Sequence, residues 1–324
     1  MIIPEHWAEA RVQRRIDGRQ VTVRRFGWSQ TDLADAEAMA ESRATEAIER
    51  LVRGEQLDRR EPKVAYNGAE GVPIREEVVL RHGDHVITRN SYGALCLNTP
   101  EVLFADIDYQ TETPCEQMLV GFVVALVGLI AIGIFKGAPL GIYFGFVVLA
   151  AIIGPFLASV YRRARLALGG GHRRTALRRL EIWMRAHPDW LVRVYDSPAG
   201  LRLLAEHALF DPAGAAAEEF FQAMGTDRLY AQMCRRQGCF RARLTAKHWR
   251  IGISKGLRKR SWPWPADLLP EREAWIARYE AEASSYAACR YASSYGEGRP
   301  HPEAEALRKL HDEMSRATSD LPIA

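Results

Sequence analysis

The sequence has few cysteines, five in 324 residues, and they are scattered along the chain. So sparse a set excludes the disulfide scaffold of a small secreted domain. Glycine and proline, 25 and 16 residues, are too few for a collagen-like or low-complexity chain. The first ten residues, MIIPEHWAEA, contain two glutamates and no long apolar run, so we expect no signal peptide there.

Charged residues are absent from two long runs. Residues 118–135 read MLVGFVVALVGLIAIGIF, and residues 140–160 read LGIYFGFVVLAAIIGPFLASV. Each run is close to the ~20 apolar residues that a helix needs to cross a bilayer. Residues 136–139 lie between them and contain the Gly and Pro of a tight reversal. The alternative, a buried hairpin of a soluble protein, is disfavoured because soluble helices normally keep a polar stripe. The sequence therefore predicts a transmembrane helical hairpin over residues 118–160.

Acidic residues are absent after the second run until Glu181, whereas seven arginines occur there. By the positive-inside rule we expect both flanks, and thus both termini, to be cytoplasmic. This favours a multi-pass protein of an inner (plasma) membrane. Neither run contains an ionisable side chain, so the hairpin is predicted to be an anchor and not an ion pathway. Small residues at a spacing of four in the second run indicate helix packing, within the hairpin or between two copies.

The flanks of the hairpin carry opposite charge. Residues 1–117 have 15 Lys and Arg against 21 Asp and Glu, and residues 161–324 have 28 against 19. Neither flank contains enough predicted strands for a complete sheet. We therefore predict an α/β (α+β) cytoplasmic domain, formed by residues 1–117 and 161–290, with the hairpin inserted in it and a partly mobile tail at 291–324. The predicted strands are 19–28, 77–81, 85–90, 101–109, 190–195 and 201–206, and the predicted helices are 31–54, 175–186, 212–224 and 275–290.

The sharpest candidate site is Asp106-Ile107-Asp108 on an apolar strand. Strand alternation places both carboxylates on one face. Two such groups could hold Mg²⁺ or Mn²⁺ against phosphate oxygens. Two solvated acids at the end of a strand are the simpler alternative.

A second candidate is a basic tract over residues 228–266, which has 11 Lys and Arg and no acid. Arg241 and Arg243 alternate on a predicted strand, and Lys247 and Arg250 follow. Guanidinium groups on one face suit phosphate. Basic residues interleaved with tryptophans are typical of contact with nucleic acid, and equally of contact with anionic lipid headgroups. The acidic N-terminal flank as an intramolecular partner, or a solvated basic surface, are further alternatives.

The strand 103–108, followed later by a strand that leads into Ser-Pro-Ala-Gly at 197–200, resembles the catalytic core of the archaeo-eukaryotic primases and primase-polymerases. The resemblance implies metal binding by Asp106 and Asp108, and it places Ser197 and Arg202 near the nucleotide phosphate. The histidine of that family's second motif has no counterpart here, no clear third acid is present, and the apolar hairpin interrupts the core.

Two functions follow as hypotheses. The first is a membrane-anchored protein with a divalent-metal, phosphate-binding site of the nucleotidyl- or phosphoryl-transfer type, with Mg or Mn as cofactor and a nucleotide or nucleic acid as ligand. The second is a non-catalytic membrane adaptor whose basic tract binds nucleic acid, anionic lipid or a protein partner.

Overall fold

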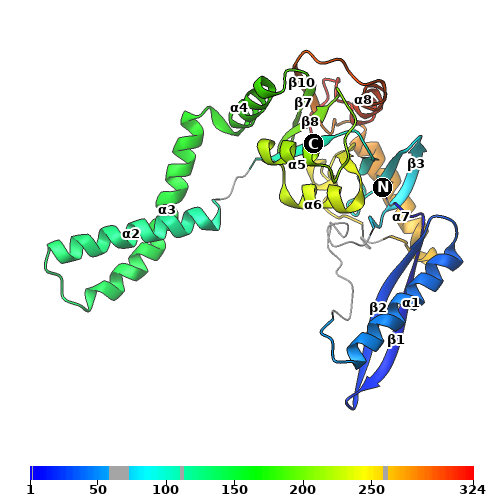
Figure 1. The fold of residues 1–324 in the computed structure, drawn as a ribbon, viewed down its shortest axis with the longest axis horizontal. Coiled ribbons are helices and arrows are strands. Elements are labelled where there is room, and N and C mark those ends of the chain that lie inside the picture. The colour runs from blue at the N-terminus through cyan, green and yellow to red at the C-terminus, as the bar shows by residue number, and fades with distance from the viewer. Residues whose placement is uncertain (2, 58–72, 110–112, 258–261) are drawn as a thin grey trace. The chain divides into compact units, whose positions relative to one another are not determined.

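The computed structural model describes the whole chain except residues 2, 58–72, 110–112 and 258–261 (Figure 1). The chain divides into two compact units. Unit 1 consists of Met1–Ile107 and Met184–Ala324, and unit 2 is Asp108–Trp183. Unit 1 mixes helices and sheets, so the predicted α+β class is confirmed at that level.

Unit 1 contains two four-stranded sheets, and each takes strands from both sides of the apolar hairpin. In the first sheet one strand precedes the hairpin and three follow it. In the second sheet three strands precede the hairpin and one follows it. The first sheet has the order β10(Arg290–Tyr295)-β7(Val192–Ser197)-β8(Gly200–Ala205)-β6(Phe104–Asp108), and the second has the order β3(Glu77–His82)-β4(His85–Arg89)-β5(Leu95–Thr99)-β9(Phe240–Arg243).

The β7–β8 hairpin is tightly constrained by its register and burial. Tyr195 pairs with Arg202, and Ser197 pairs with Gly200 across the turn. All six residues of β8 are buried. In β6 the apolar side chains and Ala105 are buried, while Asp106 is half-buried and Asp108 is exposed. An apolar strand paired with a fully buried one places Asp106 at the edge of the core.

A separate two-stranded sheet, β1(His6–Ile16) with β2(Arg19–Ser29), packs against α1(Leu33–Val52). The side chain of Asp32 accepts a hydrogen bond from the backbone N–H of Asp35 and caps the helix. A Cβ at Gly27 would lie 2.0 Å from the carbonyl oxygen of Ala36. The close approach of helix to strand therefore requires glycine at this position.

The remaining helices of unit 1 include two that differ from prediction. The last helix predicted, 275–290, begins earlier in the structure, with Pro270 in its first turn, and it ends earlier, at Ala283. Residues 291–324, predicted as a partly mobile tail, contain most of a strand that pairs with β7 and a helix with one face buried in unit 1. The helices of unit 1 that follow β8 are α5(Ala215–Met224), α6(Arg228–Gln237), α7(Leu269–Ala283) and α8(Pro302–Ser315).

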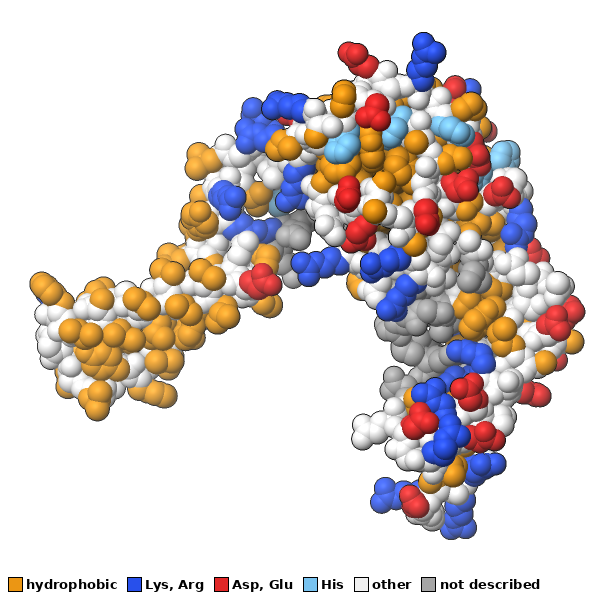
Figure 2. All heavy atoms as spheres, viewed as in Figure 1, with side chains coloured by type: hydrophobic (Ala, Val, Ile, Leu, Met, Phe, Trp, Pro, Cys, Tyr) orange, Lys and Arg blue, Asp and Glu red, His pale blue; other side chains and the backbone are white. Residues whose placement is uncertain are grey.

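Unit 2 contains α2(Cys115–Phe135) and α3(Ile142–Leu168), and α4(Gly171–Ala186) begins in it. Both α2 and α3 are long and apolar enough to cross a membrane. Only 6% and 11% of their most apolar windows are buried, so both helices expose most of their apolar side chains. Apolar side chains are spread over the face of this hairpin that is seen in Figure 2.

Glycines set the approach of α2 to α3. A Cβ at Gly154 would lie 2.4 Å from the Cα of Phe122, and one at Gly121 would lie 2.4 Å from the carbonyl oxygen of Gly154. Ala150 and Gly154 are buried, whereas a Cβ at Gly145 would meet no atom within 4 Å. The small residues at 150 and 154 are therefore used within the hairpin, and Gly145 is not.

Candidate functional site

The predicted metal ligand Asp106 is bound by a predicted phosphate ligand. Arg202 lies on β8 beside β6, and its guanidinium forms a two-point ion pair with the carboxylate. The Arg202 Nε donates to Asp106 Oδ1 at 2.8 Å, and Nη2 donates to Oδ2 at 3.1 Å. The Arg202 side chain is 4% exposed and that of Asp106 is 35% exposed. Burial alone would lower the pKa of Arg202, but the adjacent Asp106 raises it instead.

The third nitrogen of Arg202 is also occupied. Its Nη1 donates to the carbonyl oxygen of Arg243 on β9 at 2.7 Å, and it lies 3.4 Å from Nε2 of His311 on α8. The Arg202 guanidinium thus joins strands of both sheets to the C-terminal helix. This makes the Asp106–Arg202 pair a structural centre of unit 1.

His311 belongs to a buried polar network that the sequence analysis missed. Its Nδ1 lies 3.2 Å from Oδ1 of Asp312, which also accepts from the Tyr195 hydroxyl at 2.6 Å. Arg193 Nη2 donates to the other carboxylate oxygen of Asp312 at 3.0 Å. The Cys289 thiol lies 4.0 Å from Nε2 of His311. Burial alone would lower the pKa of His311, but its hydrogen bonds with Asp312 and Cys289 raise it instead.

Arg241 is engaged in the second sheet. Its Nη2 donates to Glu76 Oε2 at 2.6 Å and its Nη1 donates to Asn98 Oδ1 at 3.0 Å. Both members of the Arg241–Glu76 pair are largely buried, at 11% and 13% exposure. The Thr88 hydroxyl donates to the same Glu76 oxygen. Arg241 is therefore held by an internal carboxylate.

Arg243 alternates with Arg241 on β9, as predicted, but its partners are backbone carbonyls. Its Nη1 donates to the carbonyl oxygens of Thr245 at 2.6 Å and Ala324 at 3.3 Å. Burial, together with the nearby charge of Arg202, lowers the pKa of Arg243. Arg243 thus differs from Arg202 and Arg241, which both form hydrogen bonds with a carboxylate.

The other predicted ligands lie apart from this centre. Asp108 is exposed at the end of β6, and Ser197 is at the β7–β8 turn, two positions beyond the residue that pairs with Arg202. Lys247 precedes a short 3₁₀ helix, His248–Arg250, which contains Arg250. The Lys247 ammonium lies 5.4 Å from the ring centroid of Trp249, which is 47% exposed.

Ligands for a metal are not gathered here. Among the residues that the structure describes, no group of three or more His, Cys, Asp and Glu side chains could hold a metal ion. Asp106 and Asp108 do share a strand, as predicted, but their exposure and partners differ. Arg258, Lys259 and Arg260 of the basic tract lie outside the described residues.

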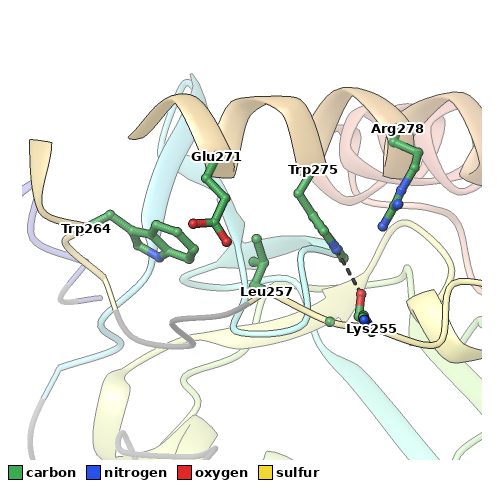
Figure 3. A pocket seen from close by; sticks show the side chains of 7 residues that line it. Lys255, Leu257, Trp264, Glu271, Trp275 and Arg278 are labelled. Carbon is green, nitrogen blue, oxygen red and sulfur yellow. Dashed lines mark hydrogen bonds between the residues drawn. The ribbon is translucent and has the colours of Figure 1, made fainter. Parts of the chain in front are cut away.

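The C-terminal part of the basic tract lines a groove. The groove lies between α7 and the loop 252–257. It consists of two adjoining hollows, of about 550 and 390 Å³, which share Lys255 and Arg278. In Figure 3, Glu271, Trp275 and Arg278 descend from one face of α7, with Leu257 and Lys255 below them. Their spacing of four and three residues is that of one helix face. We call this the Lys255–Arg278 groove.

The aromatic wall of the groove is rigid. Trp275 stacks on Tyr279 with ring centroids 5.2 Å apart, and its indole N–H donates to the carbonyl oxygen of Lys255. Trp264 is 8% exposed and lines the larger hollow. Glu282 lines the smaller one. The groove thus combines a fixed apolar wall, two exposed cations and acidic residues at both ends.

The number of basic residues in the tract could not reveal this groove, because Glu271, Trp275 and Arg278 lie outside the basic tract. Their spacing on one helix face was the available signal. Searches of protein-family models, curated proteins and solved structures find no match to the chain. The likeness to primases therefore stays a prediction.

Proposed function

We propose that the chain is a membrane-anchored, non-catalytic adaptor whose unit 1 binds a protein partner in the Lys255–Arg278 groove. The hairpin α2–α3 is the anchor. Both flanks, and with them unit 1, lie on the cytoplasmic side of an inner (plasma) membrane, in keeping with the arginines at the end of α3 and in α4.

The observation that carries the non-catalytic part of the proposal is the ion pair of Asp106 with Arg202. Both carboxylate oxygens accept hydrogen bonds from a buried guanidinium. A divalent cation would have to displace that guanidinium, which would leave a buried charge without its partner. Arg241 is similarly committed to Glu76 and Asn98. The first hypothesis, metal-dependent phosphoryl or nucleotidyl transfer with Mg or Mn, would need these pairs to open.

The lining of the groove favours a peptide over nucleic acid. Lys255 and Arg278 attract an acidic side chain, and Trp264, Trp275 and Leu257 offer apolar contact. Glu271 and Glu282 at the ends would repel a continuous phosphate backbone. An extended segment with an acidic residue flanked by apolar ones fits this order of charges.

Calorimetry of the full chain with Mn²⁺ and nucleoside triphosphates tests whether the chain binds the metal and nucleotide that the first hypothesis needs. The proposal expects the same heat from the wild-type chain and from Asp106→Asn. Metal-dependent nucleotide binding that Asp106→Asn and Asp108→Asn abolish would return the chain to the first hypothesis.

Selection from a random peptide library on the purified full chain tests the partner. We expect acidic-apolar peptides to be enriched, and Lys255→Glu/Arg278→Glu to reverse the charge of the selected peptides. Arg228→Glu/Arg299→Glu is the matched control, since both arginines are exposed and lie elsewhere. A single-stranded oligonucleotide that binds the wild-type chain and competes with the peptides would contradict a protein partner.

A further inference from the structure

We propose that the arginines of the end of α3 and of α4 form a headgroup clamp that binds anionic lipids of the bilayer that the hairpin crosses. The clamp is defined as Arg163, Arg165, Arg174 and Arg178. It is distinct from the Lys255–Arg278 groove and rests on only one part of the proposed function, the anchoring by α2 and α3.

The first support is charge. Between Glu116 and Glu181 the sequence has no acidic residue, while it has one lysine and seven arginines. All four side chains of the clamp are exposed. A cluster of 4–8 basic residues next to a membrane span is sufficient to attract acidic headgroups.

The second support is length. A helix of 27 residues extends about 40 Å, whereas the hydrocarbon core is about 30 Å thick. Tyr143 and Tyr161 lie 18 positions apart, about 27 Å along α3, which matches the two interfaces where tyrosine is enriched. With Tyr161 at one interface, Arg163 and Arg165 lie at headgroup level.

The third support is the break between the helices. Gly170, between α3 and α4, and Gly171, the first residue of α4, have φ of 83° and 85°, a conformation that L side chains rarely adopt. The chain can therefore leave the membrane normal at this point. Arg174 lies three residues after Gly171, in the first turn of α4, and we place it at the same interface.

The fourth support is the apolar content of the exposed surface, which distinguishes lipid from a purely polyanionic ligand. Leu168 is 91% exposed and Ile182 is 66% exposed. Ile182 follows Arg174 and Arg178 at helical spacing, so one face of α4 presents two guanidinium groups and an apolar side chain. Such a face suits the boundary between headgroups and acyl chains.

The test uses the full chain in nanodiscs, with acrylodan attached at Ile182→Cys in a Cys115→Ser background. Cys115 is the exposed one of the five cysteines, so the label is site-specific. We expect a blue shift of the emission in discs with 30% phosphatidylglycerol relative to discs of phosphatidylcholine alone. The shift should decrease with added salt, because salt screens exposed charges.

Variants separate charge from folding. Changing the four clamp arginines to Gln should raise the phosphatidylglycerol fraction needed for half of the shift at least threefold, whereas changing them to Lys should preserve the response. The control changes Arg14, Arg19, Arg228 and Arg299 to Gln, since these are exposed outside the clamp. An unchanged response in the clamp variant, an equal loss in the control, or an equal shift in phosphatidylcholine discs would overturn the clamp.

Two further outcomes are decisive. If an oligonucleotide in phosphatidylcholine discs gives the same shift, the surface binds nucleic acid and the lipid clamp is wrong. If the chain does not incorporate into discs at all, the anchoring fails; incorporation without the phosphatidylglycerol response rejects the clamp alone.

Discussion

At the scale of residues, Asp106 and Arg202 could bind a metal and a phosphate, or they could form an ion pair with each other. Asp106 and Arg202 were predicted to lie near one ligand, and the structure places them on neighbouring strands. Sequence alone could not show that the guanidinium would bind both carboxylate oxygens, because pairing depends on the register between β6 and β8. His311 and Asp312 were missed because they belong to a segment that Gly and Pro made look like a tail.

The first prediction concerns this pair. Asp106→Asn removes the charge that compensates the buried Arg202, and breaking a buried ion pair costs about 3 kcal/mol of unfolding free energy. This is the lower end of the usual range because the carboxylate is partly exposed. Asp108→Asn, on the same strand but exposed, should leave the urea midpoint nearly unchanged. Both urea midpoints are measured by circular dichroism in the same detergent. Equal shifts of the two midpoints would contradict the structural role of Asp106.

The second prediction concerns acid stability. His207 contacts Trp190 and Phe210, with ring centroids 4.4 and 5.4 Å apart respectively, and burial lowers its pKa. The neutral ring is thus favoured in the folded chain. Above pH 6.5, the ordinary pKa of histidine, His207 does not lower the free energy of unfolding. That free energy decreases as pH falls through 6.5 toward the lower pKa of His207 in the folded chain.

Thermal unfolding between pH 5 and 8 checks this expectation. Relative to His207→Gln, the wild-type chain should lose more stability at pH 5 than at pH 8. His85, whose pKa burial also lowers, is present in both proteins and does not affect the difference. An equal pH dependence in the two proteins would contradict a cost of protonating His207.

At the scale of elements, long and strongly patterned segments were predictable. The apolar hairpin, the helix of residues 31–54 and the strands around 101–109 and 201–206 all have clear periodicity or composition, and the structure contains them. Strand β1 and strand β10 were not predicted, because their side chains are mostly polar and their pairing partners supply the order. Helix α8 lies in the predicted tail, because its buried polar side chains resemble a solvated surface in sequence.

The third prediction concerns the contact between α2 and α3. Gly154→Leu would place a side chain against the backbone of Phe122 and Gly121, which cannot move aside without separating the helices. Such overpacking costs about 1–3 kcal/mol. Gly145→Leu adds the same apolar volume where no atom lies within 4 Å, so it should be tolerated. The midpoint of thermal unfolding in nanodiscs compares the two, and an equal loss from both would argue against close packing at Gly154.

At the scale of the whole molecule, the sequence indicated an inserted hairpin because neither flank had enough strands. The structure supplies the physical reason: β6 lies beside β8, and β5 beside β9, so each sheet closes only when both flanks are present. What the sequence could not give is the role of residues 291–324. Their strand β10 pairs with β7, and this depends on long-range contacts that no local pattern encodes.

The fourth prediction follows from that interleaving. Residues 110–183 replaced by a twelve-residue Gly/Ser linker, with an r.m.s. span of about 20 Å, should give a chain that needs no detergent, because the exposed apolar helices are gone while every strand of unit 1 remains. Its far-ultraviolet circular dichroism should keep the sheet signal. Residues 1–107 expressed alone should stay unfolded, because β6 would lack its partner β8 and β5 would lack β9. A folded 1–107 fragment, or a linker variant that aggregates without detergent, would show that the two flanks do not form one interdependent unit.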